Sequence, residues 1–200
     1  MLALAAMNND TNKIREYVVT GVDINSHTAL GFTPLMWAVD KGHGEATKLL
    51  LELGADVNKV DLDGRNIVHV ACRSVPFNKS ILSMLVEKGA NINQKDKQGN
   101  CPLNTSCRFA EGAWLSSERE KAARLLIELG ANVNIANDNG QTPIYRAIYA
   151  GNQSLVDLLI KGGSSIGISD KDGKTPTSQR SFCNFFFRGH AAPPSAVMLR

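Results

Sequence analysis

Residues 31–58 read GFTPLMWAVDKGHGEATKLLLELGADVN, and this stretch decides the fold of the chain. Thr33 precedes Pro34, and a threonine hydroxyl can cap the free N–H groups of a helix start while proline suits the first helical position. Gly42 ends the helix that follows. A second apolar run ends at Gly54, the residue type best suited to a left-handed C-terminal cap. The stretch therefore predicts the order turn, helix, turn, helix.

The end of this stretch recurs along the chain at near-constant spacing. Five phrases similar to Gly-Ala-Asp-Val-Asn begin 33, 35, 41 and 33 residues apart, at Gly21, Gly54, Gly89, Gly130 and Gly163. A second glycine follows each of them by ten residues, at Gly31, Gly64, Gly99, Gly140 and Gly173. Two series of glycines with the same spacing indicate a repeat protein, in which each unit buries its apolar face on its neighbours.

The unit resembles the ankyrin repeat family, whose repeats run Asp-x-x-Gly-x-Thr-Pro-Leu-His-x-Ala and end in Gly-Ala-Asp-Val-Asn. The resemblance implies an all-α fold, an ankyrin-repeat solenoid of stacked helix pairs with β-hairpin turns. We expect five helix pairs plus a partial sixth repeat over residues 1–176, followed by an irregular C-terminal tail, 177–200. The expected repeat units are about 1–27, 28–60, 61–95, 96–136, 137–169 and a partial 170–181.

Two insertions depart from the family pattern. Repeat three carries two extra residues near positions 75–78, and repeat four carries eight between its two helices. Ser117 and Glu120 have the spacing of a capping box, so the second helix of repeat four is predicted to start near Ser117. That start would leave Trp114 on the loop joining the two helices.

The tail holds most of the net charge. The whole chain has a formal charge of +3, and residues 171–200 contribute +4, from five basic residues and one acidic residue, so the rest sums to −1. The array thus has no overall basic field, which argues against nucleic acid as a partner. Phe182 and the three phenylalanines at 185–187 are predicted to pack partly against repeat five, with residues 189–200 mobile.

Composition excludes several other classes. Hydrophobic residues make up 43% of the chain, yet no apolar run approaches the roughly 18 residues of a membrane span, so no membrane partner is expected. The cysteines never form a Cys-x-x-Cys pair and are predicted to be free thiols, which favours a cytoplasmic, or else nuclear, location. These four cysteines are Cys72, Cys101, Cys107 and Cys183.

Motifs for catalysis are missing from the sequence. It contains no Gly-x-x-x-x-Gly-Lys-Ser/Thr phosphate loop, no Gly-x-Ser-x-Gly elbow and no His-Glu-x-x-His pair. His69 stands at the family's first-helix histidine position and His43 follows the glycine between two helices, so both are interpreted as structural. No cluster of His, Cys and carboxylates has metal-ligand spacing. We therefore expect a non-enzymatic protein-interaction scaffold with no cofactor and no metal.

The resemblance also implies where a partner binds. In the family, partners contact the hairpin tips and the exposed end of each first helix, which together line a concave surface. Carried over position by position, this surface comprises Leu30, Phe32, Asp40, Lys41, Arg65, Arg73, Arg108, Phe109 and Tyr149. Its centre is cationic, and arginine and aromatic residues often dominate binding energy. We expect a monomer that binds a protein partner through an acidic or phosphorylated segment.

Two further functions stay open on sequence alone. A substrate-recognition adaptor of a ubiquitin ligase would need a box of helices after the array, which residues 178–200 do not resemble. A fragment of a larger ankyrin-repeat enzyme or channel is the other alternative, because Met1 leaves no room for a capping unit.

Three asparagines also match a modification pattern. Asn58, Asn93 and Asn134 each lie eight residues after a leucine, which is similar to ankyrin sites modified by an oxygen-dependent asparaginyl hydroxylase. The alternative is that these side chains only bond the hairpin backbone.

Overall fold

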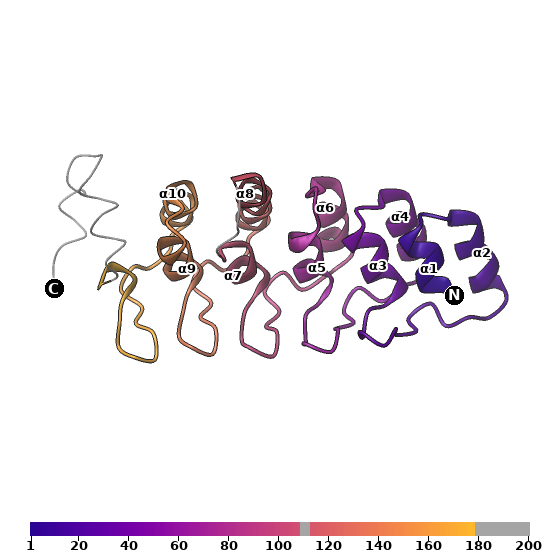
Figure 1. Ribbon diagram of the computed structural model, residues 1–200, viewed down its shortest axis with the longest axis horizontal. Coiled ribbons are helices and arrows are strands. Elements are labelled where there is room, and N and C mark those ends of the chain that lie inside the picture. The colour runs from indigo at the N-terminus through magenta and orange to yellow at the C-terminus, as the bar shows by residue number, and fades with distance from the viewer. Residues whose placement is uncertain (109–112, 179–200) are drawn as a thin grey trace.

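The computed structural model describes residues 1–108 and 113–178, and within them ten α-helices follow one another as five pairs (Figure 1). The pairs are α1 (Leu2–Met7) with α2 (Thr11–Val19), α3 (Pro34–Asp40) with α4 (Gly44–Glu52), α5 (Ile67–Arg73) with α6 (Lys79–Glu87), α7 (Pro102–Ser106) with α8 (Ala113–Glu128), and α9 (Pro143–Tyr149) with α10 (Gln153–Lys161). A short 3-10 helix, η1 (Pro176–Ser178), begins a sixth unit. The all-α ankyrin-type solenoid is confirmed.

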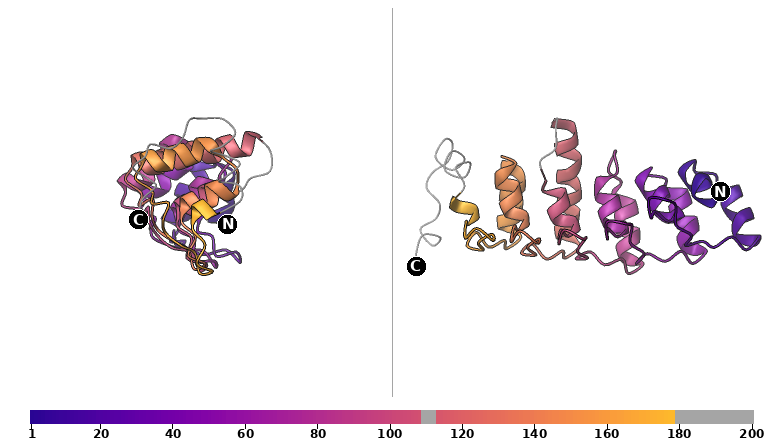
Figure 2. Two further views of the ribbon diagram at one scale, coloured as in Figure 1. Left: turned by 90° about the vertical axis from the view of Figure 1, so that its left-hand side faces the viewer. Right: turned by 60° about the horizontal axis from the view of Figure 1, so that its bottom comes forward.

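The helices form two rows. In Figure 1 the first helices of the pairs, from α3 to α9, lie in one row, the second helices, from α4 to α10, lie above them, and the turns project below. The end view in Figure 2 shows the turns extending together from one side of the helices. Neighbouring units share one continuous core, because each unit contributes a fully buried residue from its first helix, such as Leu35, Ile67, Leu103 or Ile144.

Local sequence explains where the helices begin. Thr33 Oγ1 accepts a hydrogen bond of 3.2 Å from the backbone N–H of Met36, and Pro34 occupies the first helical position. Asn66 caps α5 through the N–H of His69 in the same way. The Thr33 contact was expected from the residue types alone.

The turns repeat one hydrogen-bond pattern. One oxygen of Asp61 accepts from the backbone N–H groups of Asp63 and Arg65, both at 2.9 Å, and Asp96, Asn137 and Asp170 do the same in the next three repeats. Gly31 stands at the turn of repeat two with φ +76°, where a Cβ would lie 2.6 Å from the backbone nitrogen of Leu62. Glycine is therefore required by both the backbone angle and the close approach of the next turn. In the residues that the structure describes, these turns hold only one isolated antiparallel bridge, Val60 with Asn66.

A side chain from three of the first helices reaches the turn of the following repeat. His69 Nε2 donates to the Asn100 carbonyl at 2.9 Å, Asn104 Nδ2 donates to the Gln141 carbonyl at 3.0 Å, and the Tyr145 hydroxyl donates to Asp170 at 2.6 Å. Burial lowers the pKa of His69, which keeps this completely buried ring neutral. His43 likewise contacts the carbonyl of Met7 at 2.9 Å, in the preceding repeat.

The predicted start of the second helix in repeat four is wrong. Helix α8 begins at Ala113 and has 16 residues, against nine in α4, so Trp114 is part of the helix. Residues 113–128 contain neither glycine nor proline, so nothing in them stops the helix from growing upstream of Ser117. Part of the insertion is thus absorbed as two extra helical turns. The predictions for Phe109 and for residues 179–200 fall outside the described residues.

Candidate protein-interaction surface

One position per repeat defines the row of first-helix ends. Asp40, Arg73, Arg108 and Tyr149 each lie nine residues after the turn glycine of their own repeat. Because the repeats stack in register, these residues follow one another along the array, at or just after the ends of the first helices, which Figure 1 shows above the projecting turns. All except Asp40, which is half-buried, are exposed.

At repeat two the charges on this surface are satisfied internally. Lys41 Nζ lies 3.1 Å from the Asp40 carboxylate and 5.7 Å from the centre of the Trp37 ring. Trp37 in turn packs on Phe32, with ring centroids 5.1 Å apart. Leu30, at the tip of the turn, is an exposed apolar side chain. Repeat two therefore presents an apolar and aromatic surface whose lysine already has an anionic and an aromatic neighbour.

Arg65 is also satisfied within its own turn. Its Nε lies 2.7 Å from the fully buried carboxylate of Asp61, and its Nη2 lies 2.7 Å from Asp63. The structure thus uses this arginine to hold the turn of repeat three. The positive charge of Arg65 is neutralised locally, so the cationic character expected at the centre of the surface comes from other residues.

Those residues form what we call the arginine cluster: Arg73, Arg108 and Arg119. Arg119, on α8, donates from Nη1 to the carbonyl of Arg108 at 3.3 Å. Burial lowers the pKa of Arg119, and the charges of Arg108 and Arg73 lower it further, so the three guanidiniums share one region. Within residues 1–108 and 113–178, no carboxylate forms an ion pair with any of the three.

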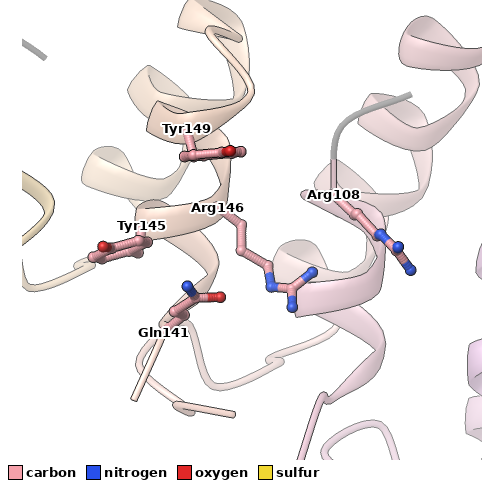
Figure 3. Close-up of a pocket in the computed structure, with 5 residues that line it drawn as sticks. All are labelled: Arg108, Gln141, Tyr145, Arg146 and Tyr149. Carbon is pink, nitrogen blue, oxygen red and sulfur yellow. The ribbon is translucent and has the colours of Figure 1, made fainter. Parts of the chain in front are cut away.

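A pocket lies beside this cluster, between repeats four and five. It has a volume of about 330 Å³ and is lined by Arg108, Gln141, Tyr145, Arg146 and Tyr149, which we call the inter-repeat pocket (Figure 3). Sequence analysis placed Arg108 and Tyr149 on the binding surface and missed Arg146. The missed signal is positional: Arg146 stands six residues after its turn glycine, where repeats two and three carry Trp37 and Val70.

The buried thiols give no sign of catalysis. Cys72, Cys101 and Cys107 are free and buried. Burial raises the pKa of Cys72 to about 12 and also raises the pKa values of the other two, so all three stay protonated and unreactive. No group of three potential metal ligands occurs among the residues described. No helix in that part of the chain is both long and apolar enough to cross a membrane.

The three asparagines of the modification pattern differ in their contacts. Asn93 Oδ1 accepts from the backbone N–H of Asn132 at 2.9 Å, and Asn134 Oδ1 accepts from that of Ser165 at 2.8 Å. Each of these side chains therefore bonds to the next repeat. The exposed side chain of Asn58 makes no such bond to any described residue.

Comparison with known proteins agrees with the fold. A family model described as "Ankyrin repeats (3 copies)" matches residues 2–96, and one described as "Ankyrin repeats (many copies)" matches residues 108–160. The chain therefore belongs to the ankyrin repeat family, whose repeats are generally non-catalytic modules for protein–protein interaction.

Similar proteins match over short segments. An ankyrin repeat-containing protein of Schizosaccharomyces pombe is 35% identical over 67 residues, which is 34% of this chain and 32% of that protein. Inversin of Danio rerio is 33% identical over 81 residues, 40% of this chain and 8% of Inversin. Palmitoyltransferase ZDHHC13 of Homo sapiens is 35% identical over 72 residues, 36% of this chain and 12% of the enzyme. The chain thus spans a third or less of each of these relatives.

Proposed function

We propose that this chain is a non-enzymatic scaffold that binds an extended, negatively charged segment of a partner protein. The observation that carries the proposal is the arginine cluster, three guanidiniums on adjacent repeats without an ion-paired carboxylate in the described structure. The partner segment would run along the row of first-helix ends. The aromatic surface of repeat two, with Leu30 and Phe32, would receive apolar residues of the same segment.

Physical reasons support a stiff array as the receptor. A surface formed by stacked helices is already ordered, so docking a flexible segment costs little conformational entropy on the receptor side. Like charges held close together repel one another, and an acidic segment removes that repulsion while it forms charge-assisted hydrogen bonds. Arginine is also a residue type that often dominates binding energy.

The test is charge reversal within the cluster. An array with Arg73→Glu and Arg108→Glu should bind its captured partner more weakly by about 2 to 5 kcal/mol, because two favourable contacts become repulsive. Affinity capture at low salt, followed by titration of the recovered partner against both arrays, measures the change.

The matched control reverses two charges elsewhere. Arg15 on α2 and Lys48 on α4 are exposed residues on second helices, away from the turns. An array with Arg15→Glu and Lys48→Glu has the same net charge as the test variant and should keep its affinity. Equal binding by the cluster variant and the wild-type array would refute the proposal.

The location, the oligomeric state and the two alternative functions are further proposals, each with its own test. We place the protein in the cytoplasm or nucleus, where its free thiols stay reduced, and we expect a monomer; imaging of a tagged chain and light scattering test these points. A ubiquitin-ligase adaptor would recover ligase subunits in the same capture experiment. A larger ankyrin-repeat enzyme or channel would be recognised from a longer transcript that contains this segment.

A further inference from the structure

The inter-repeat pocket is lined by a guanidinium, that of Arg146, whose Nε has no hydrogen-bond partner among the described residues. Arg146 lies on α9, and Figure 3 shows its side chain extending from that helix toward α7. Its Nε is buried and has no hydrogen-bond partner in the described structure. A buried donor left unsatisfied is costly, and more so when it carries charge, so this side chain is suited to an external acceptor.

Arg146 has one cationic neighbour, Arg108, and one carboxylate neighbour, Asp96. Burial lowers the pKa of Arg146, and the charge of Arg108 lowers it further, while Cys107, Asp96 and Cys101 raise it. Asp96 is already occupied, since its oxygens accept from the backbone and side chain of Asn100. The other nearby carboxylate, Asp170, accepts from the Tyr145 hydroxyl. Among the described residues, no carboxylate forms an ion pair with Arg146, so its guanidinium is open to an anion that enters the pocket.

The other lining groups suit a small anion at the end of a peptide side chain. The carboxamide of Gln141 extends toward the same space as the Arg146 guanidinium (Figure 3), and Tyr149, which also lines the pocket, is exposed. Arg108 points away from Arg146 in this conformation, but its exposed side chain can change rotamer within nanoseconds. A volume of about 330 Å³ is at the small end of ligand sites, which fits one side chain.

We propose that the inter-repeat pocket binds the phosphoryl group of a phosphoserine or phosphothreonine in the partner segment. Arg146 donates two parallel N–H groups to the phosphoryl oxygens, and Arg108 supplies the second positive charge. A phosphoryl group with nearly two negative charges matches two guanidiniums, whereas a carboxylate neutralises only one of them. This inference rests on the proposed function and names the chemical group that anchors the segment.

The experiment compares three peptide pools on the full chain. Each pool consists of labelled nine-residue peptides with randomised flanks around a fixed central residue: phosphoserine, serine or glutamate. By fluorescence polarisation, the phosphoserine pool should bind about tenfold or more tightly than the glutamate pool, as expected for charge-assisted bidentate bonds. The Nε–H signal of Arg146 in a ¹H–¹⁵N spectrum should shift when the phosphoserine pool is added.

Variants assign the preference to one side chain. Arg146→Gln should bind the phosphoserine and glutamate pools equally, and Arg146→Lys should keep part of the preference, because lysine retains the charge without the paired donors. Arg124→Gln is the control, since Arg124 lies on α8 in an ion pair with Glu120. Thermal unfolding of Arg146→Gln should show an intact array, since the substitution removes an uncompensated charge.

The outcomes separate this inference from the proposed function. Equal binding of phosphoserine and glutamate pools by the wild-type array, no binding of any phosphorylated pool, or a preference kept by Arg146→Gln overturns the phosphoryl pocket. If the Arg73 and Arg108 reversal still abolishes partner capture in that case, the proposed function stands. If that reversal has no effect, the proposed function fails independently of the peptide result.

Discussion

Repeats two and four present the same region to solvent, the end of their first helix, but their charges are paired differently. Lys41, at the end of α3, is neutralised by Asp40 and covers Trp37, whereas Arg108, in the equivalent region of repeat four, has no ion-paired carboxylate within the described residues. The backbone is nearly the same in both places. The comparison shows that the scaffold provides positions for contact, and that the pairing of each charge decides which positions are available to a partner.

The largest effect expected from this comparison is on the free energy of unfolding, when an ion-paired arginine and an arginine without an ion pair are each replaced by alanine. Arg65→Ala removes the cation beside the fully buried Asp61 carboxylate and should lower the free energy of unfolding by about 1 to 3 kcal/mol. Arg73→Ala touches no ion pair and should stay within about 0.5 kcal/mol of wild type. Urea unfolding of both variants measures the difference. Equal losses would show that the distinction between paired and unpaired arginines has no energetic basis.

A smaller effect is expected in the pH dependence of stability, to which repeats three and four contribute differently. His69 and Asn104 both bond to the turn of the next repeat, but only the histidine titrates. Burial lowers the folded-state pKa of His69, so stability is complete above the unfolded value of about 6.5 and declines as the pH falls toward the folded value. Between pH 7.5 and 5.5 the Tm of wild type should fall further than that of His69→Asn, by an amount on the order of a few °C.

Comparing wild type with His69→Asn cancels the effect of the other titrating groups on the Tm, because both chains share those groups. His69→Asn introduces the residue that repeat four already uses at this position, so the bond to the next turn can be kept. Identical decreases of Tm in the two chains would exclude His69 as a source of the acid sensitivity.

The smallest expected effect is a difference in hydroxylation among Asn58, Asn93 and Asn134, which requires no change in stability. The exposed side chain of Asn58 makes no bond to a described residue of the next repeat, whereas Asn93 and Asn134 are held by such bonds. If an asparaginyl hydroxylase modifies the array in cells, added oxygen should be most abundant on Asn58. Peptide mass spectrometry of the chain isolated from cells measures the occupancy, and absence of added oxygen on all three asparagines would end the hypothesis.

The repeat architecture was readable from sequence because its signals are local. A left-handed backbone strongly favours glycine, so Gly31 and Gly54, with φ of +76° and +90°, mark the turns regardless of their surroundings. Thr33 and Pro34 mark a helix start through contacts within four residues. The wrong start of α8 also has a local cause: Ser117 and Glu120 have capping-box spacing, but the residues before them favour helix as well.

The candidate site could be predicted only in part, because it depends on contacts between residues distant in sequence. The positions of Arg65, Arg73 and Arg108 followed from the repeat register, and Asp61 lies only four residues before Arg65. Only the structure showed that Asp61 is buried and paired with Arg65, and that no carboxylate among the described residues pairs with the other two arginines. Arg146 gave a signal only by contrast with Val70, its apolar equivalent.

Sequence alone thus determined the repeat, its turns and its family, since these follow from backbone angles and short-range hydrogen bonds that each unit makes by itself. Tertiary structure decided which charges are free and where the pocket lies. The pocket exists only because the side of α9 that carries Arg146 faces α7 of the preceding repeat. Arg146 and Ser106, the last residue of α7, are 40 residues apart in the chain. Burial and Coulomb interactions depend on distances across that interface, and no spacing within a single repeat specifies them.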